Sequence, residues 1–458
     1  MFSGFYQGEK MKKLTKIIVA ALAGSLIVSS LTSCGKKKEE KGSVRFLNFK
    51  PEVAAIYQEL AAAYEKEKGV KVIVETAANN SYESTLTSKM ATKQAPTLFQ
   101  INGPVGYGNW KNYCADLTDT EIYKHLSDKS LAVTSNGRVY GIPYVVEGYG
   151  IIYNKAITDK YFALPSKASK LSSMDEVKNF AALKEVVEDM QKNAAALGIK
   201  GVFASTSLKA GEDWRWQTHL ANLPVYYEFK RKNADLSDPE ASKKLDFEYD
   251  AEFKNIFDLY LNNSVIPPQN TGVKTVDNSM AEFALEECAM VQNGNWAWGQ
   301  ISGVSGNKVK SINVKYLPIY TGVSGEEGQG LCIGTENFYC INKKASPADQ
   351  KATADFIYWL YSSVTGKDYV TNKLGFIAPF DTFAAKERPT DPLAIEIANW
   401  MEKPGITSVS WNFTVFPSQT FKDNFGASLL RYAQGSKKWA AVKADVVKEW
   451  ASEKALAE

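Results

Sequence analysis

Histidine is scarce in this chain, and net charge is almost absent. Among 458 residues there are only two histidines, His125 and His219, and the formal net charge is +3. Two histidines exclude a histidine-rich metal site, and neither lies in a setting typical of the base of a Ser-His-Asp triad. A charge so close to zero favours neither nucleic acid nor an acidic partner. We therefore expect no metal, no cofactor and no nucleic acid, and we interpret both histidines as structural.

Cysteine is also rare, with five residues in the whole chain. Four of them lie in apolar or aromatic surroundings, and their spacing matches no short disulfide framework. These four are Cys114, Cys288, Cys332 and Cys340. An exported protein could pair them, but we favour the interpretation that they are buried free thiols.

The fifth cysteine, Cys34, ends a leader that predicts export. A positively charged region precedes the apolar run 17–31, which is too short and too rich in serine to suit a membrane span. The run ends in Leu-Thr-Ser-Cys, which resembles a bacterial lipobox. We therefore predict a lipoprotein signal peptide over 1–34 with Cys34 as the lipidated residue. The alternative is a signal anchor with a chance cysteine.

Two short segments flank this leader. The charged segment 35–43 has nothing to bury, so we expect a flexible tether that lets the lipid at Cys34 hold the protein on the outer face of the membrane. The residues before Met11 form an N-terminal extension, which leaves Met1 and Met11 as candidate starts.

Aromatic residues, in contrast, are abundant, with 23 Tyr, 22 Phe and 10 Trp. The balance of 45% hydrophobic and 23% charged residues is that of an ordinary globular protein, and the length favours two or three domains or lobes. Flat aromatic faces suit a ligand that presents flat apolar faces of its own. Sugar rings do so through their C–H groups.

The stretch 279–301 concentrates this aromatic signal. Ser279 followed by Glu282 has the spacing of a capping box and predicts the start of a helix. A short buried strand over 288–291 comes next, and then Trp296 and Trp298, which point the same way if the segment is extended. We interpret Trp296 as a stacking platform and Trp298 as core; the alternative is that both indoles are core.

Alternating strands and helices after the tether predict an α/β fold. Strands over 44–49 and 70–74 flank a helix near 54–64, and a third strand over 96–101 follows another helix. This order predicts a doubly wound lobe, whose ligands bind beyond the carboxyl ends of the strands. That rule selects as binding residues Asn48, Lys50, Glu52, Asn102 and Trp110.

Two further segments supply candidates. In the apolar run 140–155, Glu147 is an isolated carboxylate, which is costly unless it is paired or lines a cleft, and the neighbouring Gly148 and Gly150 suit a hinge crossing. Downstream, Trp214 and Arg215 lie in a polar and aromatic cluster before an apolar helix, and we include both as candidate ligand-binding residues.

Three segments carry a resemblance to a known family. They are Phe283 with Ala289-Met290 and Gly294-Asn295-Trp296, then Gly141-Ile142-Pro143 with Glu147 and Tyr153-Asn154-Lys155, and finally Leu317-Pro318 with Ile341-Asn342-Lys343 and the helix 346–362. On these residues, the chain from about Ser43 to its end resembles the extracellular solute-binding proteins (family 1) of bacterial ABC sugar importers, the maltose-binding-protein-like group.

The resemblance implies a class II periplasmic-binding-protein-like fold, in which two doubly wound α/β lobes are joined by three hinge crossings. Carried over by position, lobe 1 covers 43–147 and 321–372, and lobe 2 covers 149–316 and 378–458. One residue departs from the family pattern, which usually has glycine at the position of Glu286. A glycine there would accept a left-handed helix end.

The resemblance also implies a site and a function. It implies sugar contacts for Trp296, Glu147 and Asn48, and it places Trp411 in a region that often supplies another stacking ring. It implies a monomeric, lipid-anchored protein that captures a carbohydrate, in particular an oligosaccharide, and delivers it to the permease subunits of an ABC importer.

Other classes of function stay open. An exported carbohydrate-active enzyme would need two facing carboxylates about 5–10 Å apart, and the sequence offers Glu147 with only Glu52 as a candidate partner. An extracytoplasmic sensor subunit, or a binder of peptide, polyamine or metal, would keep the fold. We expect a binding protein rather than an enzyme.

Overall fold

The computed structural model describes residues 41–78, 81–236, 239–335, 337–384, 386–412 and 415–456. The predicted signal peptide with Cys34, and the candidate starts Met1 and Met11, lie outside the described residues, as does most of the predicted tether. Contacts divide the chain into Met1–Glu40 and Lys41–Glu458, and the second unit forms the body described below. No helix in the described ranges is long and apolar enough to cross a membrane.

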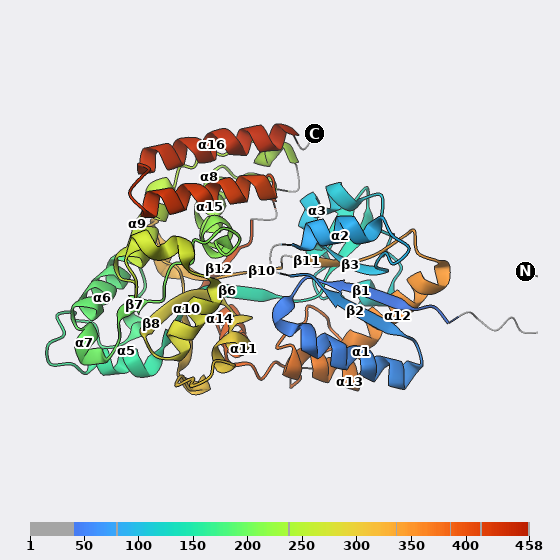
Figure 1. Ribbon diagram of the computed structural model, residues 1–458, viewed down its shortest axis with the longest axis horizontal. Coiled ribbons are helices and arrows are strands. Elements are labelled where there is room, and N and C mark those ends of the chain that lie inside the picture. Colours follow the sequence, from blue (N-terminus) through green and yellow to red (C-terminus); the bar gives the residue numbers. More distant parts are fainter. Residues whose placement is uncertain are drawn as a thin grey trace, which may run out of the picture. The chain divides into compact units, whose positions relative to one another are not determined.

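Two six-stranded sheets organise this body (Figure 1). The first has the order β2-β1-β3-β11-β5-β4, with β1 parallel to β2 and β3, and β11 antiparallel to β3 and β5. Its strands are β1 (Val44–Asn48), β2 (Val72–Thr76), β3 (Leu98–Asn102), β4 (Val133–Ser135), β5 (Arg138–Pro143) and β11 (Asn337–Ile341).

The second sheet has the order β12-β10-β6-β8-β7, and β9 pairs with β6 beside this path. Its strands are β6 (Glu147–Asn154), β7 (Gly201–Phe203), β8 (Cys288–Gly294), β9 (Val314–Leu317), β10 (Gln329–Gly334) and β12 (Thr407–Ser410). All eight residues of β6 are buried, as expected for a central strand that is covered on both faces.

Alternating side chains bury both faces of the first sheet. Along β1, Phe46 packs into a core with Tyr57 of one helix layer, whereas Leu47 packs into a separate core with Leu86 on the other face. The helices around this sheet are α1 (Ala54–Lys68), α2 (Tyr82–Met90), α3 (Gly103–Trp110), α4 (Glu121–Lys124), α12 (Pro347–Ser362) and α13 (Val364–Asp368).

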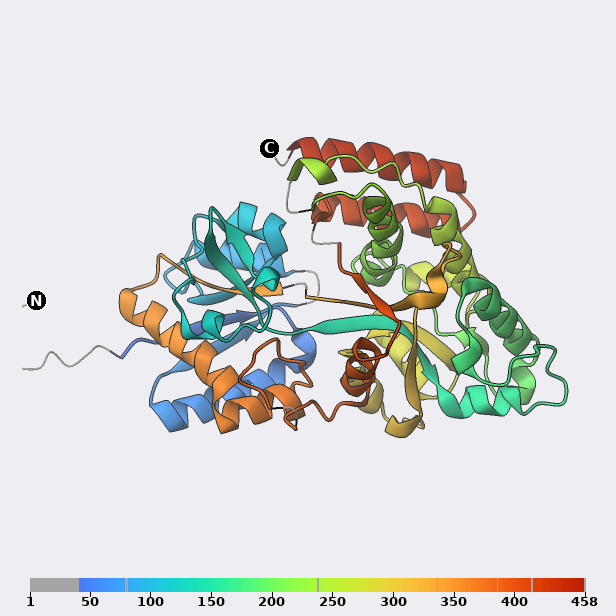
Figure 2. The same cartoon turned by 180° about the vertical axis from the view of Figure 1, so that it is seen from behind.

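The second sheet is likewise enclosed by helices. In both views α15 and α16 lie side by side (Figures 1 and 2). The helices are α5 (Lys155–Phe162), α6 (Phe180–Lys192), α7 (Ala194–Leu197), α8 (Asn222–Arg231), α9 (Asp250–Asn262), α10 (Val276–Ala284), α11 (Ala297–Ser302), α14 (Pro392–Met401), α15 (Gln419–Ala433) and α16 (Trp439–Leu456). Two π-helical turns occur at Arg215–Leu220 and Tyr369–Lys373.

The predicted lobe boundaries need two corrections. Phe380 pairs with Leu126 and packs into the core of the first sheet, whereas the prediction assigned 378–458 to lobe 2. β10 pairs with β6 and β12, so residues 329–334 belong to the second sheet, whereas the prediction assigned 321–372 to lobe 1. Backbone pairing decides to which sheet β10 belongs. The predicted boundary was set at the loop after β9, and the sequence there does not show with which strand β10 pairs. The glycines expected at a hinge, Gly148 and Gly150, both lie inside β6.

The helix before β8 begins earlier than the sequence predicted. α10 starts at Val276 with a capping box formed by Thr275 and Asn278, not at Ser279. The Ser279 hydroxyl lies inside the helix, where it donates to the Ser205 carbonyl oxygen at 2.9 Å. Glu282 accepts the Ser205 N–H at 2.7 Å instead of capping the helix. Two possible capping motifs begin four residues apart, at Thr275 and at Ser279. The helix uses the first, because Ser279 and Glu282 bind partners elsewhere in the fold.

Glu286 ends α10 in the conformation that glycine usually supplies. Its φ is 58°, in the left-handed region. The Glu286 N–H donates to the Phe283 oxygen at 3.0 Å and the Glu287 N–H to the Glu282 oxygen at 2.9 Å, the two bonds of a Schellman motif. The Glu286 carboxylate also accepts from the Asn154 amide at 3.0 Å. The helix therefore ends as the family pattern requires, without the glycine.

The cysteine prediction is confirmed. Cys114, Cys288, Cys332 and Cys340 are all buried and free. Burial raises the pKa of the Cys332 thiol to about 12, so it stays protonated and inert.

Candidate ligand-binding site

A cavity of about 240 Å³ opens where segments that follow strands of the two sheets meet. We call it the first chamber. Its lining on the side of the first sheet is Phe49, Lys50, Pro51, Glu52, Ala78, Tyr82, Glu83, Asn102 and Asn337. Its remaining lining is Glu147, Trp214, Gln217, Thr218, His219, Val276, Asp277, Trp296, Gln300, Gln419 and Lys422.

Backbone pairing places Trp296 next to Glu147. The Asn295 N–H donates to the Gly148 oxygen at 3.0 Å, and the Gly148 N–H donates to the Asn295 side-chain oxygen at 2.9 Å. These two bonds join the end of β8 to the start of β6. A Cβ on Gly294 would lie 2.2 Å from the Trp296 ring, so the indole lies directly on that glycine. The predicted position of Trp296 in a cavity therefore has a local backbone cause.

The two indoles of this stretch do not point the same way. Trp296 immediately precedes α11 with helical φ, so the segment is not extended. Trp296 lines the first chamber, whereas Trp298 does not and packs instead, half-buried, against the core cluster that contains Phe283 and Ile301. The extended geometry assumed from the sequence was wrong.

Three rings meet on this side of the chamber. The ring centroids of Trp214 and Trp296 lie 6.2 Å apart, and the imidazole of His219 lies 5.1 Å from Trp214 and 5.4 Å from Trp296. His219 also stacks on Tyr149 at 4.4 Å. Burial, aided by nearby cations such as Lys422, lowers the pKa of His219 to about 3, so the ring is neutral. The sequence analysis missed His219 as a cavity residue.

A buried ion pair joins the two sides of the chamber. The Lys50 ammonium lies 2.8 Å from the Glu147 carboxylate and 3.6 Å from the Glu52 carboxylate. Lys50 and Glu147 are 6% and 4% exposed. The same ammonium lies 5.6 Å from the Trp296 ring centroid, within the range of a cation–π contact. The structure thus brings together four of the predicted residues.

Asn48 acts through Lys50 rather than on a ligand. It is fully buried and does not line the chamber. Its amide donates to the Lys50 oxygen at 2.7 Å, and its side-chain oxygen accepts the Lys50 N–H at 3.0 Å. The predicted sugar contact of Asn48 is therefore wrong, and Asn48 instead stabilises the turn that positions Lys50.

Asn102 lines the chamber, as predicted. Its side-chain oxygen is buried, and among the described residues no group donates a hydrogen bond to it. The side-chain oxygen of Gln300, which the sequence analysis did not select, is in the same state. A buried acceptor without a donor is costly, so both oxygens suit donors from a ligand.

Three more predicted residues lie outside the chamber. Trp110 is 8% exposed, packs against Phe99 and donates its indole N–H to Glu83 at 3.0 Å. Trp411, also 8% exposed, stacks behind His219 at 6.1 Å. Both rings support residues that line the chamber, and neither lines it.

Arg215 is the third of these. It is 0% exposed and donates to the Gln292 oxygen, the Ser207 hydroxyl and the Ser279 hydroxyl at 3.1, 2.5 and 2.9 Å. Burial lowers the pKa of its guanidinium to about 10, which leaves it charged at neutral pH. Arg215 therefore fastens the π-helical turn to β8 and α10, and its predicted role at the ligand is not supported.

The sequence analysis also missed charged residues supplied from distant segments. Glu83 on α2 and Lys422 on α15 both line the chamber. Burial raises the pKa of Glu83, while the Trp110 indole N–H and the Lys422 charge act in the opposite direction. Counting Glu52, Glu147 and Asp277 as well, the chamber holds more carboxylates than lysines.

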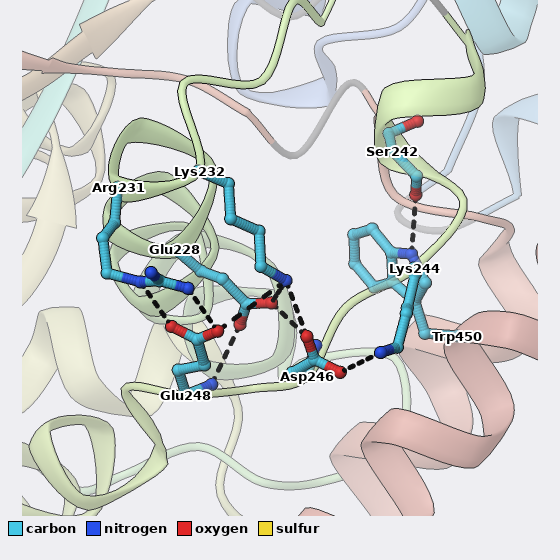
Figure 3. A network of polar contacts seen from close by, with 8 residues as sticks. All are labelled: Glu228, Arg231, Lys232, Ser242, Lys244, Asp246, Glu248 and Trp450. Atoms are coloured by element: carbon cyan, nitrogen blue, oxygen red, sulfur yellow. Dashed lines mark hydrogen bonds and ion pairs between the residues drawn. The ribbon is translucent and has the colours of Figure 1, made fainter.

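Figure 3 shows a second group of carboxylates, none of which lines the chamber. Oxygens of Glu228, Asp246 and Glu248 approach one another within 4.8 Å. Glu228 accepts the Asp246 and Glu248 N–H groups at 2.7 and 2.9 Å, Lys232 contacts all three carboxylates, and Arg231 binds Glu248 with two bonds of 2.6 Å. Cations therefore occupy the place a metal would take, and the cluster fastens α8 to the following loop.

A model of the family described as bacterial extracellular solute-binding protein matches residues 59–396. The melibiose/raffinose/stachyose-binding protein MelE of Bacillus subtilis is 31% identical over 134 residues, which cover 28% of this chain and 30% of that protein. A maltooligosaccharide ABC transporter solute-binding lipoprotein of Streptococcus pneumoniae is 26% identical over 229 residues, 47% of this chain and 46% of that protein. The chain thus spans less than half the length of these two relatives.

A solved structure extends the likeness to almost the whole chain. A family 1 extracellular solute-binding protein from Bifidobacterium longum subsp. infantis superposes with a TM-score of 0.62 at 17% identity, covering 90% of this chain and 99% of that one. This likeness and the two enclosed sheets confirm the predicted class II two-lobe α/β fold. Because the family model matches well over half of its residues, the chain belongs to the bacterial extracellular solute-binding protein family.

Proposed function

We propose that this protein captures an uncharged oligosaccharide in the first chamber and delivers it to an ABC importer, while a lipid at Cys34 anchors it to the outer face of the membrane. The observation that carries the proposal is the Trp296 ring beside the buried Lys50–Glu147 ion pair. The aromatic face can bind the C–H face of a sugar ring, and the paired charges beside it can bind the hydroxyl groups.

The aromatic half of the site supplies contact area. The ring centroids of Trp214, His219 and Trp296 lie within about 6 Å of one another. These contacts fix the orientation of the rings before a ligand arrives. Stacking of aromatic pairs contributes about 0.5–1.5 kcal/mol beyond area burial, and we assume the same scale for a sugar face.

The polar half of the site orients the ligand through hydrogen bonds. Glu147 accepts and Lys50 donates hydrogen bonds, and the buried oxygens of Asn102 and Gln300 accept them. Hydrogen bonds to charged groups contribute about 1.5–3 kcal/mol each, which is more than neutral ones. A ligand rich in hydroxyl groups satisfies all four residues.

The charges favour an uncharged ligand. Each lysine of the chamber has a carboxylate nearby, Lys50 with Glu147 and Glu52, and Lys422 with Glu83. An anionic sugar would meet a surplus of carboxylates. The names of the relatives support oligosaccharides, since MelE is named for melibiose, raffinose and stachyose and the Streptococcus lipoprotein for maltooligosaccharides. The same lipoprotein supports the anchor and the ABC importer.

A binding role fits the site better than hydrolysis. A glycoside hydrolase needs one carboxylic acid that donates a proton and a second carboxylate across the bond. Glu147 and Glu52 share the Lys50 ammonium, an arrangement that favours two acceptors over a proton donor. Closure of the lobes around a ligand supplies the signal to the importer without any chemistry.

Calorimetry with defined sugars tests this function. The lipid-free protein is titrated with melibiose, raffinose and stachyose, with maltooligosaccharides and chitin oligosaccharides of two to four rings, and with a uronic acid oligosaccharide. We expect a neutral series to bind, the radius of gyration to fall in solution scattering, and no shorter product to form. Preference for the uronic acid oligosaccharide, or release of product, would contradict the proposal.

The anchor is tested separately in the producing cell. Cys34→Ala should move the protein from the membrane fraction to the medium or periplasm, while ligand affinity stays unchanged because the first chamber is built from residues far along the chain. Retention of the variant at the membrane would refute lipidation at Cys34.

A further inference from the structure

We propose that the ligand continues from the first chamber into a second one and is therefore an oligosaccharide of three or more rings. This inference rests on the proposed function, since it specifies the length of ligand that the same site takes. The second chamber is a cavity of about 280 Å³. It adjoins the first because the same four side chains, Glu52, Glu147, Trp296 and Gln300, line both.

The sizes of the two chambers favour joint use. Each cavity, at 240 and 280 Å³, lies just below the range of about 300–1,000 Å³ that sites for small-molecule ligands usually span. The joined space falls inside that range. A short sugar can rest on Trp296 in the first chamber, and we expect an added ring to extend past Trp296 into the second.

The second chamber has its own indole. Trp298, which the sequence analysis assigned to the core, is half-buried and lines this chamber but not the first. Because α11 turns between them, Trp298 lines the second chamber alone, whereas Trp296 lines both. Each chamber therefore combines a tryptophan face with polar groups, the same combination that supports sugar binding in the first chamber.

The junction between the chambers carries an unsatisfied acceptor. Gln300 lines both cavities, and its buried side-chain oxygen accepts no hydrogen bond from any described residue. An amide oxygen requires a donor, and a hydroxyl of a ring that passes the junction supplies one. A ligand confined to the first chamber would contact Gln300 from that chamber alone.

Polar residues also occur among those that line the second chamber alone. Asn372, Thr390 and Asp391 line it together with the apolar Phe376. One oxygen of Asp391 caps α14 through the Leu393 and Ala394 N–H groups at 2.9 and 3.0 Å, which fixes the carboxyl group in place. The remaining oxygen is available to a hydroxyl group of the ligand.

Gly299 provides a way to fill the second chamber alone. It lies on α11, lines only the second chamber, and a Cβ added there meets no heavy atom within 4 Å. Gly299→Leu therefore places bulk in the open space without straining the fold. Gly108→Leu on α3 is the matched control, because Gly108 is also an exposed helical glycine with no heavy atom within 4 Å and it lines neither chamber.

Calorimetry with a length series tests the inference. Wild type, Gly299→Leu and Gly108→Leu are titrated with melibiose, raffinose and stachyose, and with maltooligosaccharides and chitin oligosaccharides of two to four rings. In the series that wild type binds, affinity should rise from two to three rings. Gly299→Leu should weaken binding of three- and four-ring sugars by about tenfold or more and of two-ring sugars by less than about twofold. Gly108→Leu should match wild type.

A second variant tests the junction independently. Gln300→Leu removes the acceptor, and we expect a larger loss of affinity for three rings than for two. An equal loss at every length, or no loss with Gly299→Leu, would overturn the second chamber while leaving the proposed function intact. A wild-type protein that binds no oligosaccharide would instead refute the proposed function, and the second chamber with it.

Discussion

On the side of the first sheet, hydrogen-bonded loops hold the ligand-facing groups in place, whereas packed rings do so on the opposite side of the first chamber. Asn48 brackets Lys50 with two hydrogen bonds, and the Trp110 indole N–H holds Glu83. Across the chamber, the rings of Trp214, His219 and Trp296 hold one another by contact. The Lys50–Glu147 pair joins the two arrangements.

The two arrangements should fail in different ways. Removal of one buried charge leaves its partner without compensation, so stability falls together with affinity. Removal of a half-exposed ring opens a space that water can enter, so affinity falls and stability changes little. Substitutions on the two sides therefore separate folding from binding.

The largest effect is expected for Glu147→Ala. Loss of one partner of a buried pair costs about 3–5 kcal/mol. Because Glu52 also lies 3.6 Å from the Lys50 ammonium, we expect the lower end, about 3 kcal/mol of unfolding free energy, in urea denaturation. The double variant Lys50→Met with Glu147→Leu should regain most of that stability and still bind ligand poorly. If Glu147→Ala proved as stable as wild type, the pair would contribute nothing to folding.

The next effect is the loss of affinity in Trp296→Ala. A central tryptophan contributes about 2 kcal/mol or more, so calorimetry should show a fall of about thirtyfold to a hundredfold. The unfolding free energy should change little, because the ring is half-exposed. Trp400→Ala is the matched control, since that half-buried indole lines a separate cavity on the second sheet alone. Unchanged affinity in Trp296→Ala would remove the ring from the site.

The sequence predicted which segments of the chain form the site better than it predicted which side chains face the cavity. Trp296, Glu147 and Lys50 follow or begin strands whose pattern is local, and their position in the cavity was predicted. Asn48 was selected for the same reason, and Arg215 for its place in a polar and aromatic cluster. The polar atoms of both turn to backbone or to neighbouring hydroxyls. Residue type and strand end do not specify which way a side chain turns.

The missed residues come from segments far apart in the sequence. Lys422 approaches Glu83 only because α15 contributes to the lining of the first chamber, and no local pattern in the sequence marks that contact. His219 was interpreted as structural because it lies in no setting typical of a catalytic base, and its stacking on Tyr149 supports that interpretation in part. Its face toward the chamber depends on the π-helical turn, which no sequence signal indicated.

A smaller effect concerns the pH dependence of the ring cluster. The pKa of His219 is about 3 in the folded protein, chiefly through burial, against about 6.5 in an unfolded chain. Between these values the unfolded chain binds a proton that the folded chain does not, so the free energy of unfolding falls as the pH drops below about 6.5. From about pH 8 to about pH 5 this amounts to about 2 kcal/mol.

His219→Phe tests that dependence. The variant keeps a ring beside Tyr149 and cannot take up the proton, so its loss of stability between about pH 8 and about pH 5 should be smaller by about 2 kcal/mol in urea denaturation. His125→Phe is the control, because it removes the other histidine, which lies beside Asp381 and does not line the first chamber. Equal pH slopes in wild type and His219→Phe would show that the folded chain protonates His219 as readily as the unfolded one.

The smallest effect is expected at Glu286, outside both chambers, where stability should change without affinity. A non-glycine residue in the left-handed region costs about 1–2 kcal/mol, and Glu286→Gly removes that cost. The variant also loses the 3.0 Å bond to Asn154 and gains freedom in the unfolded chain, so we expect a net gain of about 0.5–1 kcal/mol in thermal unfolding. Glu287→Gly, one residue on and without a positive φ, should destabilise the protein instead. A loss of stability in Glu286→Gly would mean that the bond to Asn154, which ties the end of α10 to β6, outweighs the strain of the backbone.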